Sequence, residues 1–316
     1  MGKANINNTA YEERLGTDRM LPLVLRMAMP SVAAQIVNLL YNLVDRIYIG
    51  HIPGIGTDAL AGIGVTGAII ILISAFSAIV SGGGAPLAAI ALGQGDRKRA
   101  GQTLGNGFVL LLIFTLLTTT LTYLFMEPLL MFTGASENTV GYAKDYLSIY
   151  LLGTLFVETS VGLNTFINTQ GRPAIAMYSV LIGAVLNIIL DPIFIFVMGM
   201  GVRGAALATV ISQACSALWI VSFLTSKRAS LRLEFRYMRP DRNVISHILA
   251  LGVSPFIMAS TESLVGFVLN SSLEKFGDIN VSALAIMQSA MLVVSVPLAG
   301  FAQGFVPIVS IRYTCV

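Results

Sequence analysis

The stretch Asn187–Phe196, NIILDPIFIF, places an acid and a proline inside a long apolar run. Similar runs recur along the whole chain, each long enough to cross a bilayer core of about 30 Å. Apolar residues make up 55% of the 316 residues and charged residues only 11%, against roughly 25% charged in an ordinary soluble domain. The sequence therefore predicts an all-α polytopic membrane protein.

Eight transmembrane helices are expected from the lengths of the apolar runs. Their predicted bounds are 22–48, 59–91, 103–125, 143–168, 174–198, 203–224, 245–270 and 281–310. The first 19 residues are polar and lead directly into the first span, so no signal peptide is expected.

Basic residues divide unevenly between the predicted loops. Most lie in the N-terminal tail and in three segments, 93–101, 170–173 and 225–243, whereas the alternate loops carry only Lys144, Arg203 and Lys275. Cytoplasmic loops carry the excess of Lys and Arg. We therefore expect a protein of the cell (inner) membrane with a cytoplasmic N-terminus, and the basic balance needs no nucleic-acid partner.

An internal repeat divides the chain. The first span, MPSVAAQIVNLLYNLVDRIYIG from Met29, resembles the seventh, SPFIMASTESLVGFVLNSSLEKFG from Ser254, and aligning Pro30 with Pro255 places Asp45 on Asn270. Transporters are often built from such repeats, with the substrate site between them. The expected parts are a cytoplasmic tail (1–20), a six-helix N-lobe (21–225), a basic cytoplasmic linker (226–243) and an incomplete start of a C-lobe (244–316).

Four carboxylates fall inside the predicted spans: Asp45, Glu158, Asp191 and Glu262. Each acid at the centre of a span costs about 2.5–3.5 kcal/mol on insertion scales. Some of them must therefore face a cavity, pair with another group or carry a proton. The alternative for each is a structural hydrogen bond between helices.

Helical rise places part of this polarity at one depth. Asn187 and Asp191 share a face one turn apart, and Asp45 and Thr209 reach the same outer half of the membrane from two other spans. A polar stripe of Gln35, Asn38 and Asn42 precedes Asp45 on the first span. We predict a cavity lined by this stripe; the full set of candidate lining residues is Gln35, Asn38, Asn42, Glu158, Asn164 and Glu262.

Prolines and glycines indicate where the helices bend. Pro192 removes a backbone donor and frees the carbonyl of Ile188 beside Asp191, as a gated ion site would require, and Pro30 is a second candidate bend. The glycines of SGGGAP (81–86) favour close helix packing or bending, since no lysine follows at phosphate-loop spacing. His51, His247 and the two cysteines have no metal-ligand spacing, so no metal site is expected.

Five motifs together resemble the multidrug and toxic compound extrusion (MATE) family. They are NIILDPIFIF, GVRGAALATVISQ (201–213), LVDRIYIG (43–50), LGQGDRKRA (92–100) and GFAQGFVPIVS (300–310). The resemblance implies twelve helices in two lobes, and export of cationic or amphipathic drugs in exchange for Na⁺ or H⁺. It also implies a cation-binding or proton-coupling site at Asp45, Asn187, Asp191 and Thr209, with no cofactor besides the coupling ion.

The chain departs from the family pattern at its end, where SIRYTCV replaces the usual S-x-x-Y-G. This departure favours a truncated form, and a non-transporting remnant is one alternative. A lipid-linked oligosaccharide flippase of the same superfamily is another. An enzyme is not expected: GQGD (93–96) fits an intramembrane protease pattern, but Asp96 lies in a cytoplasmic loop, far from the other acids that catalysis would need.

Overall fold

The computed structural model describes residues 20–274, 287, 291, 295–305 and 308–309, and the regular elements among them are helical. The first half contains α2 (Met20–Gly50), α3 (Gly56–Ile79), η1 (Val80–Gly84), α4 (Ala85–Gly93), α5 (Arg97–Leu124) and α6 (Met126–Phe132). The second half contains α7 (Val140–Thr169), α8 (Pro173–Pro192), η2 (Ile193–Val197), α9 (Val202–Thr225), η3 (Phe235–Tyr237) and α10 (Arg242–Glu274).

Seven helices in the described part are long and apolar enough to cross a membrane. They match the first seven predicted spans, and α3, η1 and α4 together form a single span, Gly56–Gly93. The predicted eighth span, 281–310, lies largely outside the described residues, although 295–305 are helical. The sequence did not predict α6, whose 7 residues are too few to span a bilayer.

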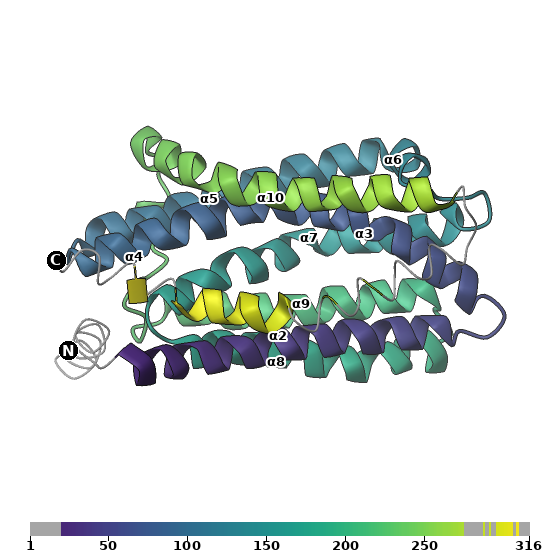
Figure 1. Cartoon of the computed structure of the whole chain (residues 1–316), viewed down its shortest axis with the longest axis horizontal. Coiled ribbons are helices and arrows are strands. Elements are labelled where there is room, and N and C mark those ends of the chain that lie inside the picture. Colours follow the sequence, from purple (N-terminus) through teal and green to yellow (C-terminus); the bar gives the residue numbers. More distant parts are fainter. Residues whose placement is uncertain (1–19, 275–286, 288–290, 292–294, 306–307, 310–316) are drawn as a thin grey trace.

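The long helices run side by side along the long axis of the molecule (Figure 1). Helix α7 packs against α3, α5 and α9, and α8 packs against α2 and α9. Small residues permit the closest of these approaches: a Cβ at Gly153 of α7 would collide with Val210 of α9. Close approach through glycine is a usual way for membrane helices to associate.

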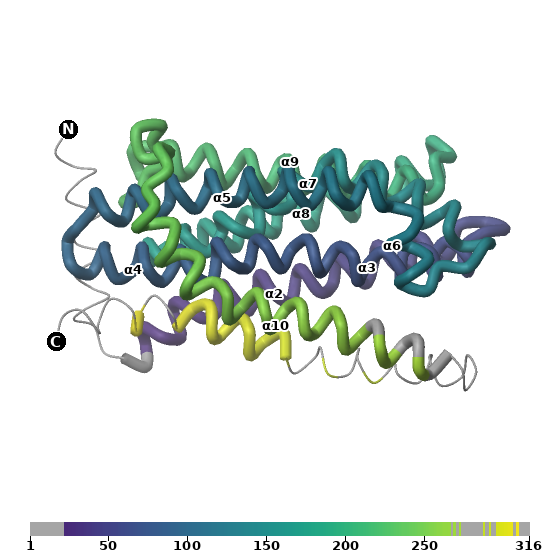
Figure 2. Tube along the Cα trace, turned by 90° about the horizontal axis from the view of Figure 1, so that it is seen from above, coloured from purple at the N-terminus to yellow at the C-terminus, as the bar shows by residue number. Residues whose placement is uncertain are grey.

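Helix α10 lies along the outside of the other helices, against α3, η1 and α5 (Figure 2). The helical segment 295–305 packs on α2 instead, since Gly300 and Gly304 abut Val32 and Ala28. The division of the chain into an N-lobe, a linker and a C-lobe stays a prediction.

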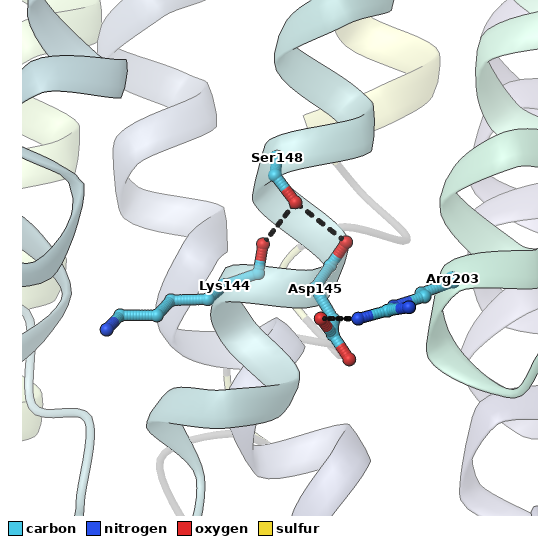
Figure 3. A network of polar contacts seen from close by, with 4 residues as sticks. All are labelled: Lys144, Asp145, Ser148 and Arg203. Carbon is cyan, nitrogen blue, oxygen red and sulfur yellow. Dashed lines mark hydrogen bonds and ion pairs between the residues drawn. The ribbon is translucent and has the colours of Figure 1, made fainter.

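The basic segments gather at one end of the bundle. The α4–α5 turn and the linker between α9 and α10 lie together at the left of Figure 1. At the opposite end, Arg203 Nη2 lies 2.8 Å from Asp145 Oδ1 and joins α9 to α7 (Figure 3). Exposed pairs of this kind contribute about 0–1 kcal/mol, so this one orients the helix ends more than it stabilises them.

The linker is docked on the bundle by side-chain amides. The Asn106 side chain is buried; its Nδ2 donates to the Tyr237 carbonyl (3.2 Å), and its Oδ1 accepts from the Asp241 N–H (2.8 Å). On α7, Gln170 Oε1 accepts from the Leu231 N–H at 3.0 Å. The segment predicted only as a basic linker is therefore anchored to α5 and α7.

Asn106→Ala should release the linker from α5. The substitution leaves the Tyr237 carbonyl and the Asp241 N–H without their partner, and an unpaired buried polar group costs about 1–3 kcal/mol. We expect a lower unfolding temperature in detergent and faster tryptic cleavage between α9 and α10. Asn243→Ala is the control, because that side chain is exposed; equal cleavage rates in the two variants would contradict the role of Asn106.

Candidate cation site and cavity

Two polar side chains of α8 lie buried one turn apart. Asn187 is 2% exposed and Asp191 is fully buried. Asn187 Nδ2 donates to Asp191 Oδ1 at 3.2 Å and approaches Thr209 Oγ1 of α9 at 3.4 Å. The i,i+4 spacing on α8 and the packing of α9 against it bring these three residues together.

The fourth predicted residue, Asp45, reaches this cluster from α2. Its carboxyl lies close to the Asp191 carboxyl. In the described part of the chain Asp45 forms no ion pair with the exposed Arg46. The structure thus places Asp45, Asn187, Asp191 and Thr209 in one cluster between α2, α8 and α9.

The oxygen atoms of this cluster fit a small monovalent cation or a shared proton. Among the described residues, Asp45 Oδ1, Asn187 Oδ1 and Asp191 Oδ2 are buried without a hydrogen-bond donor. Two adjacent carboxylates repel each other unless a positive charge or a proton lies between them. Carboxylate and carbonyl oxygens are also the ligands that hard cations prefer. No soft ligand belongs to the cluster.

The backbone changes its hydrogen-bond pattern directly beside the site. Helix α8 ends at Pro192, and Ile193–Val197 continue it as a π-helical turn, η2. Proline removes one backbone donor, and π-turns within helices often mark functional sites. Pro30 differs, because α2 continues through it as an α-helix.

Two tyrosines and a glutamine that were not predicted from the sequence also lie at the site. Tyr146 is buried on α7 close to Thr209, and its ring stacks on Tyr150 with centroids 6.0 Å apart. Tyr41 lies close to Gln213. Tyr41 precedes Asp45 by four residues on α2, so helical spacing could have identified it.

A cavity of about 190 Å³ lies beside the cluster, between α2, α7, α8 and α9. Neutral polar side chains supply much of its lining, including Gln35, Asn38, Ser160, Asn164, Asn168 and Gln213. Ser160 Oγ donates to Gln213 Oε1 at 2.7 Å, and Asn164 Nδ2 donates to Ser179 Oγ at 3.0 Å. Within the described part of the chain, the cavity therefore offers hydrogen-bonding groups and no charged side chain.

Three predicted lining residues lie elsewhere. Asn42 is exposed on α2 and donates to the Asn38 carbonyl at 2.7 Å, and Glu262 is exposed on α10. Glu158 is buried and accepts hydrogen bonds from the hydroxyls of Ser74 and Ser77 on α3. Glu158 thus joins α7 to α3. This contact is the structural hydrogen bond between helices that was the alternative for each carboxylate within a span.

The fold defines a polytopic helical membrane protein, and the chain belongs to the MatE family, whose family model matches residues 30–193. Among curated proteins it is similar to the "Multidrug export protein MepA" of Staphylococcus haemolyticus (strain JCSC1435), with 25% identity over 290 residues, 92% of this chain and 64% of that protein. The chain thus spans just under two thirds of the length of this relative.

Solved structures of the same family share the fold. One, titled "Crystal structure of MATE in the bent conformation", has a TM-score of 0.85 at 27% identity over 96% of this chain and 67% of that one. Another, titled "Outward-facing conformation of a multidrug resistance MATE family transporter of the MOP superfamily", has a TM-score of 0.83 at 27% identity over 92% of this chain and 64% of that one.

Proposed function

We propose that the protein is a secondary active transporter that exports cationic or amphipathic compounds in exchange for H⁺ or Na⁺. The observation that carries the proposal is the juxtaposition of two carboxylates, Asp45 and Asp191, from different helices, with donor-free oxygens buried between them. Similarity to a multidrug export protein supports the class of cargo.

In this proposal Asp45 and Asp191 hold the coupling ion or proton. Asn187 fixes the Asp191 carboxylate through its Nδ2 and turns its own Oδ1 to the same site. Binding or release of one positive charge changes the repulsion between α2 and α8, and therefore the relative free energies of two arrangements of these helices. Pro192 and η2 follow directly after Asp191, so the end of α8 can bend at this point.

Cargo would occupy the neutral polar cavity next to the cluster. Because the described residues of its lining include no Lys or Arg, they offer no cationic partner for the pyrophosphate of a lipid-linked sugar. A cationic compound meets no like charge there and benefits from the nearby carboxylates when they are ionised. The lining thus favours drug export over the flippase alternative.

We further propose that the protein acts without catalysis in the cell (inner) membrane, with its N-terminus in the cytoplasm. The gathering of the basic turn and linker at one end of the bundle supports this orientation. The expected partners are the lipid bilayer, small-molecule drugs and the coupling cation or proton.

The test is a transport assay in proteoliposomes. The reconstituted protein is the one encoded by the whole open reading frame that contains these residues. Ethidium movement is recorded under an imposed Na⁺ gradient, an imposed pH gradient or neither. We expect transport against the ethidium gradient under one of the two ion gradients. A folded, correctly inserted protein that moves no ethidium under either gradient would rule the proposal out.

A further inference from the structure

A second cavity, of about 550 Å³, lies at the basic end of the bundle. It is formed by the end of α4, the start of α5 and the start of α10, away from the cluster between α2, α8 and α9. The ends of transmembrane helices lie at the level of the lipid headgroups. The cavity is therefore placed where a phospholipid headgroup would meet the protein.

The lining of this cavity has an apolar part and a polar part. Leu87, Ile90, Ala91 and Val244 supply apolar side chains from α4 and α10. Gln94, Gln102 and Asn243 supply neutral polar groups near the turns. A soluble ion would use only the polar part, whereas an amphiphile would use both.

Charged side chains of both signs line the polar part in equal number. Lys98 and Arg99 are cationic, and Asp96 and Asp241 are anionic. One carboxylate oxygen of each acid accepts a backbone N–H, from Arg99 or from Asn243, at 2.9 Å. Within the described part of the chain these two cations and two acids form no ion pairs, so each keeps capacity for a ligand.

We propose that this cavity binds a phospholipid whose headgroup carries both a phosphate and a primary ammonium, as in phosphatidylethanolamine. Lys98 and Arg99 bind the phosphate, Asp96 and Asp241 accept hydrogen bonds from the ammonium, and Leu87, Ile90 and Val244 contact the start of an acyl chain. This role is separate from the proposed transport, since none of these residues belongs to the cation site.

The charge pattern distinguishes this lipid from its common relatives. Phosphatidylglycerol has no cation for the two carboxylates, which would instead repel its net negative charge. Phosphatidylcholine has a cation, but its quaternary ammonium carries no N–H to donate. Soluble phosphoethanolamine has the right charges and no acyl chain, so it reports whether the apolar lining contributes.

The experiment compares these four ligands on the purified full chain in detergent. Short-chain forms of the three lipids, and phosphoethanolamine, are titrated while the unfolding temperature and the bound lipid in native mass spectrometry are recorded. We expect phosphatidylethanolamine to bind at least about tenfold more tightly than phosphatidylcholine, because hydrogen bonds to charged groups are worth about 1.5–3 kcal/mol and 1.4 kcal/mol is a factor of ten.

Two double variants separate the charges. Asp96→Asn with Asp241→Asn keeps acceptors for the backbone N–H groups and should remove the preference over phosphatidylcholine. Lys98→Gln with Arg99→Gln should weaken all three lipids by roughly 30-fold, at about 1 kcal/mol for each basic residue near an anionic headgroup. The matched controls are the exposed Asp58→Asn at the other end of the bundle and Lys227→Gln with Arg228→Gln at the same end.

Each outcome supports the proposal or overturns it. Loss of the preference in the Asn variant, with the controls unchanged, supports it. An equal response to phosphoethanolamine alone would mean a site for a soluble anion or zwitterion and overturn the lipid assignment. A stronger response to phosphatidylglycerol, or an equal loss in the Lys227 and Arg228 control, would reduce the effect to general surface charge and overturn it as well.

Discussion

Asp191→Asn should abolish ion-driven export while leaving expression and folding intact. The Asp191 side chain is fully buried, and its Oδ1 accepts from Asn187 Nδ2 at 3.2 Å. Asparagine has nearly the same shape and its carbonyl oxygen can keep that hydrogen bond. The substitution removes the negative charge that would hold a cation or proton opposite Asp45. Export would then no longer be coupled to the ion gradient. The measurement is ethidium transport in proteoliposomes under the driving ion gradient, expected to fall to the level of empty vesicles.

The matched control is Asp58→Asn, the same chemical change at an exposed position in the first turn of α3. It should transport as the unsubstituted protein does. Binding of ethidium without a gradient provides a second readout, since the cavity lining does not include Asp191. Undiminished gradient-driven export by Asp191→Asn would show that the cluster around Asp191 does not couple export to the ion gradient. This conclusion would hold whichever compound the cavity binds.

The spans and the common depth of the candidate site residues could be predicted because both depend on properties of single helices. Apolar length predicts eight spans, and the described residues contain the first seven of them. The rise per residue put Asn187, Asp191 and Thr209 at one depth, and the structure joins them by contacts of 3.2 and 3.4 Å. Nothing beyond helix length, direction and spacing was needed for these predictions.

Which helices are neighbours does not follow from the properties of single helices. Glu158 is a candidate either for the cavity lining or for a structural hydrogen bond between helices, and in the structure its face of α7 meets Ser74 and Ser77 of α3, a contact that no periodicity within α7 reveals. Glu262 lies exposed on α10, and its role in the cavity stays a prediction. The π-turns η1 and η2 were missed: glycine or proline indicates a weakened helix, and the new hydrogen-bond pattern depends on tertiary packing.

Gly83→Ala should displace α10 from the other helices. Gly83 lies in η1, where an added Cβ would come within 2.8 Å of the Gly252 nitrogen and closer still to the Ile248 carbonyl oxygen, both on α10. These are backbone atoms, so no side-chain rotation relieves the collision and the whole helix must shift. Overpacking of this kind typically costs about 1–3 kcal/mol, and we expect a lower unfolding temperature in detergent.

Gly64→Ala is the control, because a Cβ at that position on α3 meets nothing within 4 Å. There alanine removes a flexible glycine from a helix, worth roughly 0.5–1 kcal/mol in favour of the folded state, so the two substitutions should act with opposite signs.

The position of α10 can be followed directly, since Ser263 Oγ donates to the Ala68 carbonyl of α3 at 3.1 Å. In a background without the two native cysteines, Ser263→Cys and Ala68→Cys should be joined by a short bifunctional thiol reagent, and adding Gly83→Ala should slow the reaction. If crosslinking and stability are the same with alanine at Gly83 as at Gly64, then α10 does not depend on this glycine contact. In that case the predicted role of the SGGGAP glycines in close helix packing would be wrong.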